Sequence, residues 1–146
     1  MVRLKNEADR RKPPARREAL VDLKILRRAI MVGVIFELAL VALGHIRPAF
    51  KPTFELFGCM LIAGVAGLLY ARDLARGYGA GALGGAAVGA VCGLTAVAAA
   101  SLMGDRPDLF IPYGVIVSTI TGVAGGFFGQ LDAQLRVIIK NLQSGQ

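Results

Sequence analysis

Glu37 is the residue whose type and position most directly suggest chemistry. It lies in the apolar run IMVGVIFELALVAL, eight residues after Ala29, where a stretch without basic residues begins. Eight residues of α-helix rise about 12 Å, so a helix that crosses a bilayer from Ala29 places this carboxyl group near the midplane. An acid at that depth is costly in free energy and usually faces a bundle interior or a water-filled cavity, which makes Glu37 a functional candidate.

Two interpretations of Glu37 are open. In the first, the carboxyl group is protonated and hydrogen-bonds a hydroxyl or a carbonyl, and so joins the first membrane helix to the fourth or to a partner subunit. In the second, it carries a proton or a cation for a coupled transporter or channel. No Lys or Arg lies at that depth, so no salt bridge within the chain is expected. The hydroxyls expected at a similar depth belong to Thr95, Ser118, Thr119 and Thr121.

His45 is the only histidine, which excludes a multi-histidine metal site. It follows Glu37 by eight residues and is expected near the outer membrane surface. It is either solvated there or forms, with Arg47 and Glu55, the mouth of a pathway that leads to Glu37.

The remaining reactive residue types form no recognisable site. Cys59 and Cys92 have neither metal-ligand nor CxxC spacing, and small apolar packing residues are their simpler role. The sequence GYGAG at 77–81 follows no predicted strand, so it is not a phosphate-binding loop. We therefore expect no enzyme activity, no cofactor and no bound metal.

Glycine recurs at every fourth position of GYGAGALGGAAVGAVCG. Residues four apart lie on nearly one face of an α-helix, and small residues there let two membrane helices approach closely, as in GxxxG contacts and glycine zippers. We expect the glycine faces to pack against one another within the chain. Self-association through one of these faces and a glycine-lined pore or substrate groove are the alternatives. The expected packing residues of the third span are Gly77, Gly81, Gly85, Gly89 and Gly93. They are expected to face either Gly114, Ser118, Gly122 and Gly126 of the fourth span or the small-residue row of the second span, Cys59, Ala63, Gly67 and Ala71.

The overall composition indicates that these residues lie in membrane helices. Hydrophobic residues make up 55% of the 146 residues and charged residues only 18%, against about 25% in soluble domains. Charges cluster between four apolar runs, each close to the roughly 20 residues that cross a bilayer. The predicted spans are Ala29–Ile46, Phe54–Ala71, Gly79–Met103 and Phe110–Leu131.

The flanking segments carry most of the basic residues. Residues 1–28 hold ten of the 17 Lys and Arg, and we divide them into a mobile arm, 1–14, and an amphipathic interfacial helix, 15–28. Residues 29–131 form the bundle, and 132–146 form a cytoplasmic amphipathic tail that extends the fourth helix. The residues expected to meet anionic lipid headgroups are Arg16, Arg17, Lys24, Arg27 and Arg28.

The basic residues also predict an orientation. With both termini in the cytoplasm, fourteen Lys and Arg residues lie inside and three outside, as the positive-inside rule favours. We expect an integral protein of a bacterial inner membrane. No aromatic residues alternate with the basic ones, so nucleic acid is not an expected partner.

Two segments of this chain each resemble one helix of a known membrane protein family. VIFELAL with Glu37 is similar to the first span of small multidrug-resistance transporters, and the glycine run resembles the packed helix of rotary-ATPase proteolipids. This chain has no tryptophan and no evident internal repeat, so it is assigned to neither family. The function expected is a non-enzymatic accessory or packing subunit of a membrane assembly, or a self-associating bundle. The alternative is a small proton- or cation-coupled transporter or channel.

Overall fold

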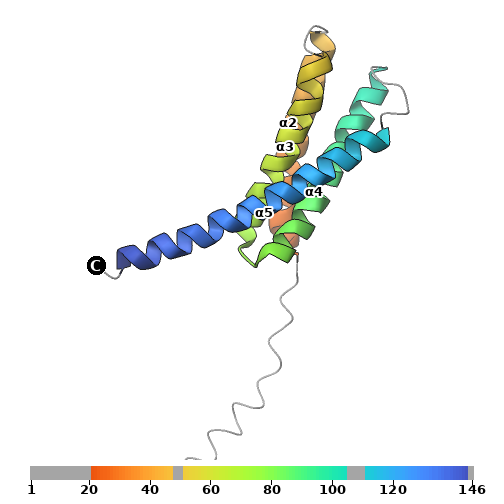
Figure 1. Ribbon diagram of the computed structural model, residues 1–146. Helices are drawn as coiled ribbons and strands as arrows, with labels where there is room; N and C mark the ends of the chain where they lie inside the picture. Colours follow the sequence, from red (N-terminus) through yellow and green to blue (C-terminus); the bar gives the residue numbers. More distant parts are fainter. Residues whose placement is uncertain (1–20, 48–50, 105–110, 145–146) are drawn as a thin grey trace, which may run out of the picture.

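The computed structural model describes residues 21–47, 51–104 and 111–144, with only the backbone described at 51–56 and 111. These residues form four α-helices (Figure 1). Each helix is long and apolar enough to cross a membrane, which confirms the predicted all-α class with four candidate spans. The helices are α2 (Leu23–Ile46), α3 (Lys51–Leu74), α4 (Tyr78–Leu102) and α5 (Ile111–Ser144).

α2 begins six residues before the predicted span. Asp22 caps its first turn, because Oδ1 accepts hydrogen bonds from the backbone N–H groups of Lys24 at 3.0 Å and Ile25 at 3.4 Å. Such a cap satisfies amides that have no partner inside the helix and stabilises it by about 1 kcal/mol. Residues 23–28 therefore continue into the first span as one helix, and their placement at a membrane interface stays a prediction.

The connection between α3 and α4 is only three residues long and turns the chain back on itself. Within it Ala75 has a φ of 46° and Gly77 a φ of 102°. The Gly77 value is one that side-chain-bearing residues rarely adopt, so glycine serves the turn here. Gly77 precedes α4, and a Cβ on it would meet no atom within 4 Å. The helix contact of the predicted glycine row thus begins one step later, at Gly81.

α3 and α4 form an antiparallel pair on which both α2 and α5 pack. In Figure 1, α5 crosses this pair obliquely. The buried residues at the contacts are mostly small, among them Ala63, Ala66 and Ala71 of α3 and Ala96 and Ala100 of α4. Small side chains bring the helix backbones close together, which replaces the hydrophobic driving force that water supplies to soluble bundles.

α5 is the longest helix, with 34 residues. The predicted fourth span and the predicted extension from residue 132 belong to this one uninterrupted helix, which runs to Ser144. Its C-terminal part projects well beyond the other helices (Figure 1). The bundle therefore holds about the first two thirds of α5, and Gln134 is the last residue of α5 with a described hydrogen bond to another helix.

Candidate functional site

The contact between α4 and α5 is built from glycine backbone. A Cβ added to Gly85 would fall on the carbonyl oxygen of Gly122, and one added to Gly126 would fall on that of Gly81. At Gly89 the added atom would meet the Ser118 carbonyl oxygen. The two predicted rows thus lie against one another within the chain, backbone to backbone.

The same helix, α5, presents a second glycine row to α3. A Cβ on Gly125 would fall on the carbonyl oxygen of Gly64, and one on Gly129 would fall on that of Leu68. Gly67 approaches the Gly122 carbonyl oxygen in the same way, at 2.5 Å from its added Cβ. α5 therefore lies in a groove between α3 and α4. The prediction included Gly67 but not Gly64, Gly125 or Gly129, although GG at 125–126 signals two adjacent contact faces.

A third close approach joins α3 to α4. The ring of Tyr70 is fully buried and lies where a side chain on Gly84 would be. Gly84 and Gly85 point about 100° apart on the helix, so one glycine accommodates Tyr70 and the other accommodates α5. The spacing of four predicted a contact for Gly85 but not for Gly84, and the doubled glycine at 84–85 signals the second neighbour.

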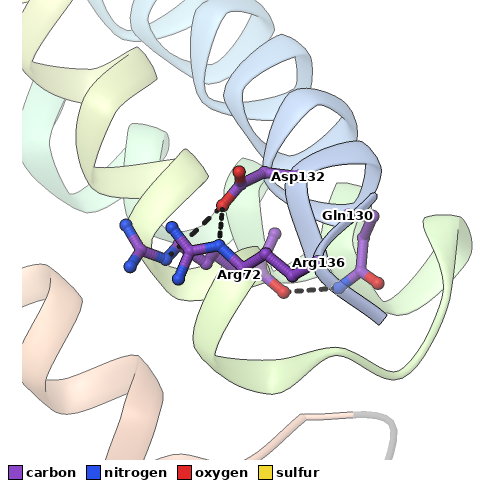
Figure 2. Close-up of polar contacts among 5 residues, drawn as sticks. Arg72, Gln130, Asp132 and Arg136 are labelled. Atoms are coloured by element: carbon purple, nitrogen blue, oxygen red, sulfur yellow. Dashed lines mark hydrogen bonds and ion pairs between the residues drawn. The ribbon is translucent and has the colours of Figure 1, made fainter. Parts of the chain in front are cut away.

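Gln130 ties α5 to both neighbouring helices at the end of the bundle where α3 and α4 are connected. Its Nε2 donates to the carbonyl oxygen of Ala71 at 2.6 Å, and its Oε1 accepts from the N–H of Gly77 at 2.9 Å. The side chain is 1% exposed, so both hydrogen bonds are sheltered from water. Figure 2 shows Gln130 reaching toward the α3 backbone. Sequence reasoning missed this residue, although an amide within the last turn of an apolar run was a usable signal.

Charged residues surround Gln130 on the outer side of the same region. Asp132 lies between Arg72 of α3, at 3.5 Å, and Arg136 of its own helix, at 3.0 Å (Figure 2). Nearby, the Tyr78 hydroxyl donates to Oε1 of Gln134 at 2.9 Å. The Arg72–Asp132 and Tyr78–Gln134 contacts join α5 to the end of α3 and the start of α4, and they hold α5 where it leaves the bundle.

Glu37 is fully buried where α2 packs on α3 and α4. The Cys59 thiol of α3, a weak donor, faces the carboxyl group. Neither carboxyl oxygen makes a hydrogen bond of ordinary distance and angle with a described residue. One turn earlier, Gly33 lies against Cys92 and Ala66, which brings α2 close to both neighbours. The site is thus a buried acid whose described polar neighbour is a weak donor, the Cys59 thiol.

The four hydroxyls predicted near Glu37 are not joined to it by any described hydrogen bond. Thr95 donates to its own helix at the Val91 carbonyl oxygen, 2.8 Å away. Thr119 and Thr121 likewise donate to carbonyl oxygens within α5. Ser118 is buried against Gly89 and Gly93 of α4. α5 packs on α3 and α4, as α2 also does, so the predicted link from the first helix to the fourth is not seen.

The other predicted residues lie at the surface or outside the described ranges. His45 and Arg47 are exposed at the end of α2. Lys24, Arg27 and Arg28 are exposed on its first turns, whereas Arg16 and Arg17, with the arm 1–14, lie outside the described residues. Within 21–47, 51–104 and 111–144, no group of three or more His, Cys, Asp or Glu side chains could hold a metal ion.

Comparison with protein families, with curated proteins and with solved structures gave no match to this chain.

Proposed function

We propose that this chain is a non-enzymatic integral membrane subunit whose packed bundle presents the end of α5 for assembly with another membrane protein chain. The closest contacts of the bundle are backbone contacts between helices. Such contacts hold helices in a fixed arrangement, which is what an accessory or packing subunit requires.

The observation that carries the proposal is the C-terminal part of α5, which projects beyond the other helices (Figure 1). Beyond Gln130 the helix retains large apolar residues, and these remain about half exposed or more. Leu135 is 50% exposed and Ile138 is 55% exposed, although both lie next to charged residues that belong in water. An exposed apolar row on a projecting helix that also carries charged residues fits a docking element better than a free end.

The orientation follows from the basic residues. We place both termini in the cytoplasm of a bacterial cell with the bundle in the inner membrane, because the positive-inside rule then accounts for fourteen of the 17 Lys and Arg. The exposed side chains of Lys24, Arg27 and Arg28 then face the cytoplasmic headgroup layer. Each contributes about 1 kcal/mol of attraction to anionic lipid.

The experiment is a measurement of particle mass after extraction of the full chain in mild detergent. The wild-type chain is expected to exceed the 15.3 kDa of one copy, after correction for detergent. Leu135→Glu combined with Ile138→Glu is expected to return it to that mass. Lys140→Glu, which changes charge on the polar face of the same helix, is the matched control and keeps the assembly. A wild-type chain that is already monomeric, or a double variant that assembles normally, refutes the proposal.

A second candidate function rests on Glu37. A fully buried carboxyl group without a described hydrogen bond is costly in a membrane unless it is protonated or holds a cation, so proton- or cation-coupled transport has a specific residue to use. The test is proton flux into vesicles that contain the purified full chain. Flux that disappears in Glu37→Gln supports transport, because glutamine keeps the size but does not titrate. Flux no greater than that of empty vesicles contradicts it.

A further inference from the structure

We propose that the tail, residues 131–144 at the C-terminal end of α5, forms a parallel two-stranded coiled coil with the same segment of a second copy of this chain. The inference rests on the proposed assembly function and specifies the partner.

Four of the large apolar residues of the tail have coiled-coil spacing, whereas Val137 and Ile139 lie off this row. Successive members of the four are four, three and four positions apart, which is the a/d pattern of a heptad repeat. These residues form a stripe narrower than the face with which a helix usually covers a globular core. The four are Leu131, Leu135, Ile138 and Leu142, and their exposed fractions run from 45% to 69%.

The chain's own bundle does not cover this stripe. At 100° per residue, Leu131, Leu135, Ile138 and Leu142 point to one side of α5. Gly122 and Gly126, which contact α4, point to the side about 140–180° away. The seam formed by these four residues therefore faces away from α4, and its side chains remain 45% to 69% exposed.

α5 is longer than the membrane core is thick, so its C-terminal end extends beyond the hydrocarbon. The 34 residues of α5 extend about 51 Å, whereas the hydrocarbon core is about 30 Å thick. Even at a tilt of about 40°, the upper end of the usual range, the helix spans about 39 Å along the membrane normal. Asp132, Arg136 and Lys140 also recur through the tail, and charged side chains are costly within hydrocarbon.

The charges around the seam suit a second copy. Two copies with the same orientation in one membrane, related by a two-fold axis, pair their tails in parallel. The positions beside the seam are Asp132, Gln134, Ile139 and Asn141. Only Asp132 is charged, and Arg72 and Arg136 of its own chain already pair with it. No like charges therefore oppose pairing.

A bilayer surface is a less suitable partner for the same stripe. Helices that lie in the interface typically have a strongly basic polar face and aromatic residues on the apolar one. The tail has two basic residues, Arg136 and Lys140, and no aromatic residue. Arg136 is paired with Asp132, which leaves Lys140 as the basic side chain for lipid.

The test is disulfide cross-linking of single cysteines in membrane vesicles. The full chain carries Cys59→Ala and Cys92→Ala, and then either Leu135→Cys or Ile138→Cys on the seam. Lys140→Cys, on the opposite side of the same helix, is the matched control. With mild oxidant, most of each seam variant is expected to migrate at twice the 15.3 kDa of one copy, while the control stays monomeric.

Each other outcome overturns the inference. Equal cross-linking at all three positions indicates random collision, and no cross-linking indicates that the tails do not pair. Seam cysteines that neither cross-link nor react with a water-soluble maleimide, beside a reactive control, indicate a tail lying on the bilayer. If the seam cysteines fail to cross-link but Leu135→Glu with Ile138→Glu still releases a different protein, the assembly proposal stands and the coiled coil alone fails.

Discussion

Gly85→Ala tests whether backbone contact between α4 and α5 stabilises the bundle, with Gly64→Ala as its matched control. The Cβ added at Gly85 would fall on the carbonyl oxygen of Gly122 and lie 3.2 Å from the Cα of Gly126. Both obstacles are backbone atoms, so no side-chain rotation relieves them. At Gly64 the added atom would lie 3.6 Å from the Thr121 carbonyl oxygen, an ordinary contact.

The two variants share one favourable term and differ in one unfavourable term. Each replaces a mid-helix glycine by alanine, which favours the helix by about 1 kcal/mol. Overpacking costs about 1–3 kcal/mol and applies only to Gly85→Ala. We therefore expect Gly64→Ala to raise the free energy of unfolding by about 1 kcal/mol. Gly85→Ala is expected to fall about 1–3 kcal/mol below it, which is the overpacking cost.

The buried thiol of Cys92 provides the assay. Cys92 is fully buried, so it reacts with a thiol reagent only when the bundle opens. In a Cys59→Ala background, the midpoint of Cys92 labelling along a titration with a denaturing detergent reports stability. A Gly85→Ala midpoint equal to or above that of Gly64→Ala would show that this face does not carry a tight helix contact.

Three further substitutions have expected outcomes in the same assay. Gln130→Leu leaves the Gly77 N–H without its described partner and removes one of the two hydrogen bonds that the Ala71 carbonyl oxygen accepts, so it should lower the free energy of unfolding by about 1–3 kcal/mol; an unchanged midpoint would mean that water replaces the amide. Asp132→Asn removes solvent-exposed ion pairs and should change stability by less than about 1 kcal/mol, and a larger loss would show that the pairs act as a unit. Glu37→Met replaces a buried acid without a described hydrogen bond by an apolar chain of similar size and should be neutral or stabilising; a marked loss would reveal a hydrogen bond that holds α2 in place.

Much of the architecture could be predicted from the sequence because it depends on local properties. The four apolar runs are separated by charges, and bilayer thickness sets how long each must be. The helix ends were less predictable. α2 starts at Leu23 because Asp22 caps it there, and α5 passes Leu131 without a break because nothing in 132–144 interrupts a helix.

The candidate site was predictable only in part, because helix spacing shows which residues share a face but not which helix covers that face. The row from Gly81 to Gly93 required a close neighbour, and α5 is that neighbour. The polar connections were not predictable in this way. The two hydrogen-bond partners of Gln130 lie more than 50 positions away in the sequence, so no local pattern predicts them.

The sequence by itself determined that this chain has four membrane-length helices, that three of them carry small-residue faces, and that one acid lies within the first. These properties follow from hydropathy and helical periodicity, which are local. Only the tertiary structure decided that α5 lies in the groove between α3 and α4 while Glu37 faces cysteines and not hydroxyls. The physical reason is that helices in lipid associate where their backbones can approach most closely. That approach depends on the shapes of both contacting helix faces, and a single stretch of sequence describes only one of them.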